Sequence, residues 1–366
     1  MQRLEAIQTH LSRLITTGCA AGYGPDDSAM WMASLDTRTG CYPADDRRPA
    51  HLPKRCYRNI DAPKGVSLYW DQPQVTAAHR LSTLTGDRQY ADAADAYVRD
   101  FLARCVATTG IFLWGNHYYF DAFRGEVLWF LDEEPPRPSL RAQEVGTLHE
   151  ARPVLPDWAA FWRIDPAATE RCIRALATRH LVADDEPGCF NRHADGRKGC
   201  AFLESGGILV EMCCWLATTV GDAELVAIAR RFAEYSFRHR HPVTGLLENN
   251  PTETRWDKHG CTTEIGLWAG CLLRAAKNTG ETAFVTMADE AMRAYLRYGY
   301  DAHARRYYGH LHVADGSPVL GPKTTPFQPG AYAALWEPLF PAHDYPLCQY
   351  RPCACCPPLR VATTRC

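Results

Sequence analysis

One pattern occurs three times in this chain: a glycine, an acidic residue, and then apolar residues 4, 7, 8 and 11 positions after the glycine. The three glycines are Gly86, Gly221 and Gly280. Offsets of this kind lie on one face of an α-helix. A glycine is suited to end one helix, and an acid directly after it is suited to cap the start of the next. The pattern therefore predicts pairs of helices joined by a very short turn.

An apolar stretch of helical length precedes each glycine: Trp70 to Leu84, Leu203 to Leu216, and Ile265 to Leu273. A second signal, of the form D-x-x-x-G-x-aromatic, follows the paired helices. It occurs as LDTRTGCYP from Leu35, ADDEPGCFNR from Ala183, RHPVTGLLENN from Arg240 and, more loosely, YDAHARRYYG from Tyr300. Repeated helical hairpins predict a solenoid or a closed ring, and uneven spacing with polar loops favours the ring.

This alternation resembles the six-hairpin, or (α/α) toroid, proteins, which include glycoside hydrolases, sugar epimerases and polysaccharide lyases. The resemblance implies an all-α fold, an (α/α)6-type toroid with short β-hairpin loops at one face, formed by residues 1–345 as a single domain. It also implies that the N-termini of the inner helices line a cleft. We count ten or eleven helices, so the ring is expected to be incomplete at its C-terminal end.

Residues 346–366 form an irregular, cysteine-rich segment that is not expected to belong to the fold. Both a small metal site there and a frameshifted or truncated end stay open. Most other cysteines lie in apolar helical stretches and are expected to be buried, reduced thiols. Examples are Cys172, Cys213, Cys214 and Cys271.

The amino-acid composition restricts the classes of binding partner that we expect for this chain. Hydrophobic residues make up 46% and charged residues 22% of the 366 residues, as in an ordinary folded protein. A formal charge of -2 provides no net field for nucleic acid or anionic lipid. The N-terminal stretch is an amphipathic helix without a signal-peptide core, and the chain has no run of about 18 apolar residues, so we expect a cytoplasmic protein without a membrane span. The oligomeric state is left open.

The stretch WGNHYYFDAFR, residues 114–124, concentrates aromatic and hydrogen-bonding side chains. We predict His117 and Tyr118 as catalytic residues here, and Trp114, Asn116 and Arg124 as substrate-binding residues. Carbohydrate sites combine flat aromatic faces with amide, carboxylate and guanidinium groups that bind hydroxyls. The alternative is a packed core in which the same polar groups have protein partners.

Two acids, Glu204 and Glu264, lie in the first turns of neighbouring predicted inner helices. We predict them as general acid and base, although the helix dipole alone also favours an acid at such a position. Glu264 follows the polar stretch from Glu248 to His259. The remaining substrate-binding candidates are Asn191, Arg192, His193, Arg255, Trp256, Asp257, Lys258, His259 and Tyr307.

Together these residues predict an enzyme that cleaves glycosidic bonds in an oligo- or polysaccharide, one containing uronate, by hydrolysis or β-elimination. The alternative is a non-catalytic helical-repeat scaffold that binds a protein or peptide in an exposed apolar groove. Nucleotide-binding, α/β-hydrolase and zincin motifs are absent from the sequence. We predict no cofactor or metal, while a divalent ion is left open at His259 and Cys261 with Cys200, or at His149 with Glu150, or at His193 with Asp195.

Overall fold

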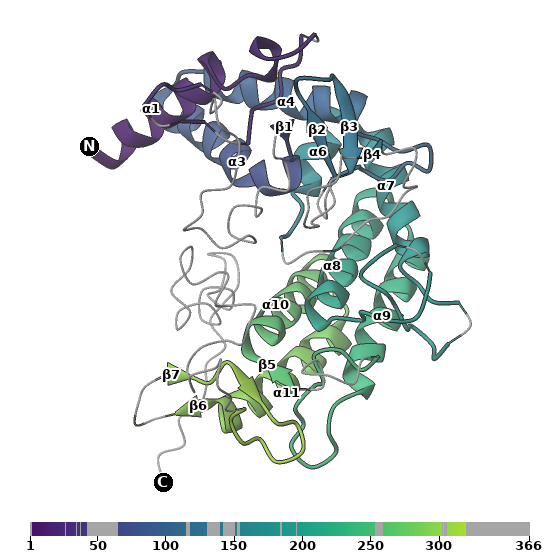
Figure 1. Ribbon diagram of the computed structural model, residues 1–366. Coiled ribbons are helices and arrows are strands. Elements are labelled where there is room, and N and C mark those ends of the chain that lie inside the picture. Colours follow the sequence, from purple (N-terminus) through teal and green to yellow (C-terminus); the bar gives the residue numbers. More distant parts are fainter. Residues whose placement is uncertain are drawn as a thin grey trace. The chain divides into compact units, whose positions relative to one another are not determined.

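The computed structural model (Figure 1) describes residues 2–25, 27–33, 35–36, 38–41, 65–114, 118–129, 140–141, 151, 154–183, 185–194, 196–252, 259–301, 303 and 306–319. The chain forms two compact units. The first consists of Met1–Asp184 with Asn191–Arg197, and the second of Asp185–Phe190 with Lys198–Cys366. Each unit is considered by itself below.

The first unit is built on helices. They are α1 (Gln2–Thr16), the short 3-10 helix η1 (Ala20–Gly22), α3 (Leu68–Thr85), α4 (Gln89–Arg104), α6 (Trp158–Ile164) and α7 (Pro166–Arg179). Helices α3 and α4 pair as one hairpin, and α6 and α7 as another. The α6–α7 turn has no glycine, because Asp165 ends α6 and also caps α7 by accepting a hydrogen bond from the Ala168 amide. The glycine–acid pattern therefore did not predict this hairpin.

A small antiparallel sheet completes the first unit. Its order is β1 (Gly65–Val66), β2 (Tyr118–Asp121), β3 (Glu126–Trp129) and β4 (Leu140–Arg141). Asp121 Oδ1 accepts hydrogen bonds from the backbone amides of Phe123 and Arg124 and so closes the turn between β2 and β3. This hairpin contains the second half of the stretch WGNHYYFDAFR.

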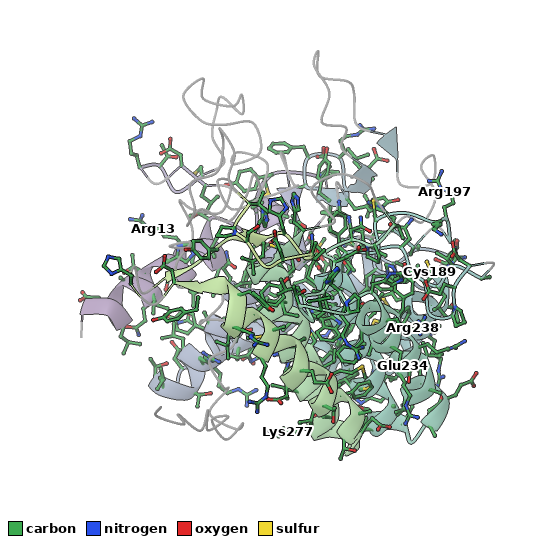
Figure 2. All side chains as sticks on the ribbon, turned by 90° about the horizontal axis from the view of Figure 1, so that it is seen from below. Arg13, Cys189, Arg197, Glu234, Arg238 and Lys277 are labelled. Carbon is green, nitrogen blue, oxygen red and sulfur yellow. The ribbon has the colours of Figure 1, made fainter. Side chains whose placement is uncertain are left out.

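The second unit contains two longer hairpins. Its helices are α8 (Leu203–Val220), α9 (Ala223–Arg238), α10 (Thr262–Thr279) and α11 (Thr282–Gly299). Its strands are β5 (Gly260–Cys261), β6 (Tyr300–Asp301), β7 (Arg306–Tyr307) and β8 (His310–Leu311), in the antiparallel pairs β5–β8 and β6–β7. On α9, Arg238 pairs with Glu186 at 2.8 Å in the loop that also carries Cys189 (Figure 2).

The predicted turn chemistry is confirmed at all three repeats. The glycines Gly86, Gly221 and Gly280 each end a helix in the left-handed conformation, with φ of 76°. The acid that follows each glycine accepts a hydrogen bond from a backbone amide two residues later, as Asp87, Asp222 and Glu281 do. Only glycine adopts this backbone conformation without strain, so the helix end is encoded locally.

The inter-hairpin loops follow a slightly different rule from the one expected. In two of the predicted loops a glycine donates to the carbonyl four residues earlier, at Gly40 and Gly245. The third example is Gly316, which donates to His312, in HVADGS rather than in the predicted YDAHARRYYG. The stretch from Tyr300 instead forms the β6–β7 pair. The signal is the left-handed glycine, and the leading aspartate is dispensable because the backbone carbonyl makes the bond.

Helices α8 and α10 lie side by side and run in the same direction. A Cβ on Gly207 would lie 2.8 Å from the Cα of Trp268, so the two backbones are in close contact. Further along both helices, Arg274 Nε of α10 lies 2.8 Å from Glu211 Oε1 of α8. The two contacts follow each other in the same order along both helices, so α8 and α10 are parallel. Their N-terminal turns therefore lie at the same end.

The all-α fold class of helical hairpins with short β pairs is confirmed, while the prediction of a single domain over residues 1–345 stays a prediction. The cysteines expected in the core, Cys172, Cys213, Cys214 and Cys271, are buried thiols without disulfides. Within the described ranges, α8 alone is long and apolar enough to cross a bilayer, and 72% of it is buried inside the protein. Burial of that kind is typical of a core helix.

Candidate active site

A group of buried polar side chains lies at the N-terminal ends of α8 and α10. Glu204, in the first turn of α8, is 5% exposed, and its Oε2 has no hydrogen-bond partner among the described residues. Glu264 is in the first turn of α10 and is partly buried. Because the two helices are parallel and in contact one turn further on, the two carboxylates lie at the same end of the helix pair.

Two asparagines line the approach to Glu204. The Asn249 carbonyl accepts a hydrogen bond from Leu203 N at 2.9 Å, and Asn249 N donates to His259 O at 3.1 Å. Asn250 Oδ1 accepts from Ala201 N at 3.1 Å. These bonds hold the loop against the start of α8, so both asparagines are fully buried.

The side-chain atoms of these asparagines are left with unused hydrogen-bonding capacity. In the part of the chain that the structure describes, Asn249 Oδ1 and Nδ2 and Asn250 Nδ2 have no partner. Both residues belong to the polar stretch singled out in the sequence, but neither was selected as a site residue. The adjacent asparagines before a predicted inner helix were the available signal.

His259 adds a neutral imidazole to this group. Its Nδ1 is buried and has no partner within the described residues, and its ring lies edge-on to that of His312, with centroids 5.0 Å apart. Burial, followed by the nearby His312 and His310, lowers the pKa of His259 below its ordinary value. Strand pairing of Gly260 with Leu311 holds these histidines together. A neutral imidazole can accept a proton in a reaction at neutral pH.

The concentration of unsatisfied atoms is energetically unusual. A buried polar group without a partner costs about 1–3 kcal/mol, while a whole domain is stable by only about 5–15 kcal/mol. Four neighbouring side chains carry such atoms here: Glu204, Asn249, Asn250 and His259. Native proteins satisfy nearly all buried polar groups, so a group of this kind indicates a site that binds water or a polar ligand.

Within residues 114–124, Trp114 and residues 118–122 are buried in the core of the first unit. Trp114 is 1% exposed and packs edge-on against Tyr69, with ring centroids 5.2 Å apart. Tyr118 is fully buried in β2. Arg124 is on the surface and pairs with Glu126 at 2.6 Å. Neither Trp114 nor Tyr118 presents a face to a ligand, so the core alternative describes these two aromatics better.

The loop of Asn191 to His193 is also held by its own contacts. Asn191 Nδ2 donates to the Arg197 carbonyl at 2.9 Å, and Asn191 Oδ1 accepts from His193 N at 3.0 Å. The His180 ring donates through Nδ1 to the Asn191 carbonyl at 2.7 Å. Asn191 therefore shapes the loop, which leaves Arg192 and His193 partly buried beside it.

The structure does not describe the side chains of the other predicted site residues. Asn116, His117, Arg255, Trp256, Asp257 and Lys258 lie outside the described residues, as does the side chain of Tyr307 in β7. Residues 114–124 and Glu204 belong to different units, so the expectation of one shared cleft stays a prediction. Among the described side chains, no three His, Cys, Asp or Glu converge to hold a metal ion.

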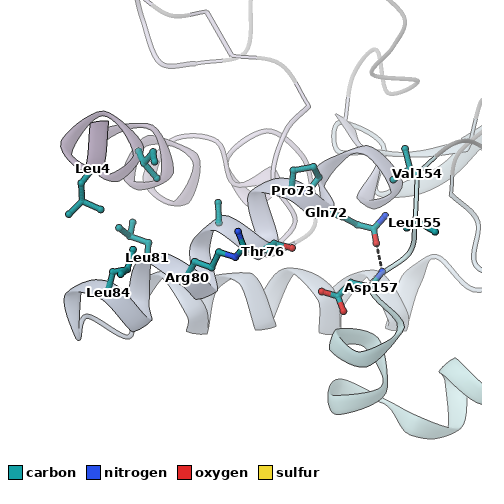
Figure 3. Close-up of a pocket in the computed structure, with 12 residues that line it drawn as sticks. Leu4, Gln72, Pro73, Thr76, Arg80, Leu81, Leu84, Val154, Leu155 and Asp157 are labelled. Atoms are coloured by element: carbon teal, nitrogen blue, oxygen red, sulfur yellow. Dashed lines mark hydrogen bonds between the residues drawn. The ribbon is translucent and has the colours of Figure 1, made fainter. Parts of the chain in front are cut away.

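An open apolar groove lies in the first unit, between α1, α3 and residues 154–157 (Figure 3). It encloses about 610 Å³ and is lined mainly by aliphatic side chains, including the exposed Leu84. One polar contact crosses its end, where Gln72 Oε1 accepts a hydrogen bond from Asp157 N at 2.7 Å. The scaffold alternative predicts a groove of this type.

The chain is similar to one protein family and to several solved structures. Residues 72–202, just over a third of the chain, match the family described as periplasmic pectate lyase. A D-mannose isomerase is similar at 13% identity over 96% of this chain and 83% of that one, with a TM-score of 0.49. A family 105 glycoside hydrolase from C. acetobutylicum ATCC 824 is similar at 10% identity over 67% of this chain, with a TM-score of 0.43.

A family 76 glycoside hydrolase from a bovine Bacteroides thetaiotaomicron strain is similar at 11% identity over 84% of this chain, with a TM-score of 0.47. The chain spans 64% of the length of the family 105 enzyme and 60% of the family 76 enzyme, less than two thirds of each. Each of these matched proteins is named as an enzyme of carbohydrate chemistry, as the resemblance seen in the helical repeats led us to expect.

The cytoplasmic location expected from the sequence is wrong. The family that matches residues 72–202 is a periplasmic one, and this finding contradicts a cytoplasmic assignment. The expectation rested on the lack of a recognisable signal peptide, which is a weaker observation than a family match.

Proposed function

We propose that this protein is a carbohydrate-active enzyme that cleaves glycosidic bonds in a uronate-containing polysaccharide, with Glu204, His259 and Glu264 as its acid–base group. The observation that carries the proposal is the set of buried, unsatisfied polar atoms at the N-terminal ends of α8 and α10. The match to the periplasmic pectate lyase family supports a uronate substrate and elimination chemistry.

In β-elimination a base removes the proton at C5 of the uronate while an acid protonates the leaving oxygen at C4. His259 suits the first task because its lowered pKa keeps the imidazole neutral. Glu204 or Glu264 in its protonated form suits the second. The amide groups of Asn249 and Asn250, together with the positive ends of two helix dipoles, would stabilise the charge that develops on the sugar carboxylate.

Hydrolysis is the second candidate, and the pair of carboxylates favours it. Glycoside hydrolysis uses one carboxylic acid to protonate the leaving oxygen and one carboxylate as base or nucleophile. Glu204 and Glu264 lie in the first turns of adjacent parallel helices, which supports their use as such a pair.

A single assay distinguishes these chemistries. The protein is incubated with polygalacturonate, alginate and glucuronate polymers, while ultraviolet absorbance of unsaturated uronates and reducing ends are followed together. Elimination produces both signals, and hydrolysis produces reducing ends alone. Neither signal on any polymer would contradict the proposal and favour a scaffold that uses the apolar groove of Figure 3.

Variants then test the residues. We expect Glu204→Gln, His259→Gln and Glu264→Gln each to lower kcat by about 10²–10⁴-fold, the range for loss of a general acid or base. The matched control is Glu234→Gln, on the exposed side of α9 (Figure 2), which should leave kcat unchanged. Full activity in all three site variants would place the chemistry elsewhere in the chain.

A further inference from the structure

A small hollow with polar groups in its lining lies in the first unit. It encloses about 170 Å³ between α1, the segment from Trp31 to Gly40, and the first turns of α3. Its floor is formed by Asp71 and Gln74 of α3, and its rim by His10 and Arg13 of α1. None of these residues takes part in the proposed function.

Asp71 is an unusual carboxyl group. Its Oδ2 accepts a hydrogen bond of 2.6 Å from the hydroxyl of Tyr97, which is fully buried on α4. Burial raises the pKa of Asp71 to about 7, against the lowering effect of hydrogen bonds from Tyr97 and the Ser67 backbone. No cation pairs with this carboxyl group within the described residues. A neutral carboxyl can both donate and accept hydrogen bonds, as hydroxyl ligands require.

Gln74 lies three residues after Asp71, on the same face of α3. Its Oε1 is buried and has no hydrogen-bond partner among the residues that the structure describes. An orphaned acceptor of this kind costs about 1–3 kcal/mol unless a donor reaches it. The carboxyl of Asp71 and the amide of Gln74 thus form a pair of hydrogen-bonding groups, one helical turn apart, that both line the hollow.

The apolar walls and the charged groups of the hollow limit the kind of ligand that it can bind. Leu14, Trp31 and Met32 provide apolar walls, and these three side chains are almost completely buried, so the walls are held by the core. Charges of both signs meet at the rim, where Arg13 and Asp36 line the same hollow, so a net-charged ligand gains little. The volume is below the roughly 300 Å³ at which pockets for drug-sized ligands begin.

We propose that this hollow binds one neutral sugar ring, with its hydroxyls bonded to Asp71 and Gln74 and its C–H face against the apolar wall. The hollow lies wholly within the first unit. This proposal rests on the proposed function only in choosing a sugar, and not another polyol, as the ligand.

Isothermal titration calorimetry with the full chain tests this site. The probes are D-glucose, D-galactose, D-mannose and L-rhamnose, with D-galacturonate as the charged comparison. At least one neutral sugar should bind at a 1:1 ratio, and Gln74→Leu should weaken it at least tenfold. The matched control is Gln89→Leu, an exposed glutamine at the start of α4, which should bind as the unmodified protein does.

Two further variants separate the alternatives. Asp71→Asn should also weaken binding, and Glu204→Gln should not, although it should lower kcat for cleavage by about 10²–10⁴-fold. The proposal is overturned if no neutral sugar binds, if Gln74→Leu binds normally, or if Glu204→Gln abolishes binding. The last result would assign the sugar to the acid–base group, and loss of cleavage alone would leave the hollow as proposed. Thermal unfolding of Gln74→Leu checks that the fold is retained.

Discussion

Replacing Asp71 by asparagine should change how the stability of this protein depends on pH. Burial is the main cause of the raised pKa of Asp71, which moves from 3.8 to about 7 in the folded protein. In the unfolded chain the same carboxyl loses its proton near the ordinary value. Between these two pKa values the folded protein holds a proton that the unfolded chain has released, so its stability falls as the pH rises.

The size of this effect follows from the shift. Each pKa unit corresponds to about 1.4 kcal/mol, so a shift of about three units sets a ceiling of about 4 kcal/mol. The carboxyl borders an open hollow, and solvent reduces the value. We therefore expect the unfolding free energy to fall by about 2–3 kcal/mol between pH 4.5 and pH 7.5 because of Asp71 alone.

Asparagine has nearly the same shape and still accepts the Tyr97 hydrogen bond, but it does not titrate. The difference in unfolding free energy between Asp71→Asn and the unmodified protein should therefore rise by the same amount across this pH range. Urea unfolding, followed by tryptophan fluorescence at pH 4.5, 6 and 7.5, measures it. Asp92→Asn, at an exposed site on α4, is the control and should show no such rise.

A difference between the two proteins that stays constant with pH would refute the reasoning, because it would mean that Asp71 titrates as an ordinary carboxyl. Carbon-detected NMR of the labelled Asp71 carboxyl provides a direct check. Its titration midpoint should lie near pH 7. The other charged groups around the hollow, His10, Arg13 and Asp36, are present in both proteins and cancel in the comparison.

Three further predictions concern the second unit. Glu204→Gln should lower kcat by about 10²–10⁴-fold while thermal stability stays equal or rises, because the buried oxygen Oε2 has no hydrogen-bond partner among the described residues; a large fall in melting temperature would contradict this. Activity should remain high just below pH 6.5 and should fall only as the pH drops through the lowered pKa of His259, because the neutral imidazole is the base. A fall in activity already at the ordinary pKa of histidine would count against that role. Gly207→Ala should destabilise the protein by about 1–3 kcal/mol, because the added Cβ would lie 2.8 Å from the α10 backbone. Gly22→Ala is the control and should be neutral, because a Cβ there would have no atom within 4 Å. Equal denaturation midpoints in urea for the two variants would disprove the close approach of the helices.

The site could be predicted from the sequence only in part. The positions of Glu204 and Glu264 at helix starts were predicted from helical spacing and from the position of the turns, which is local information, and their catalytic role stays a prediction. Trp114 and Tyr118, which were predicted to bind substrate and to act in catalysis, are almost fully buried, and an aromatic residue gives the same sequence pattern in a core as in a cleft. Asp71 was missed, although it too is an acid in the first turn of the first helix of a hairpin.

Three of the helical hairpins in the described residues follow from short sequence patterns alone, whereas the glycine–acid pattern does not predict the α6–α7 hairpin. Gly221 with Asp222, and Gly280 with Glu281, end one helix and start the next through backbone conformation and a bond spanning two residues, which need no distant partner. Which polar atoms remain unsatisfied was decided only by the tertiary structure. Within the described residues the side chain of Asn249 has no hydrogen-bond partner; the loop that carries it is held against the start of α8, and no short-range pattern records that packing. Local chemistry specifies where a helix ends, whereas burial depends on which distant segments cover it.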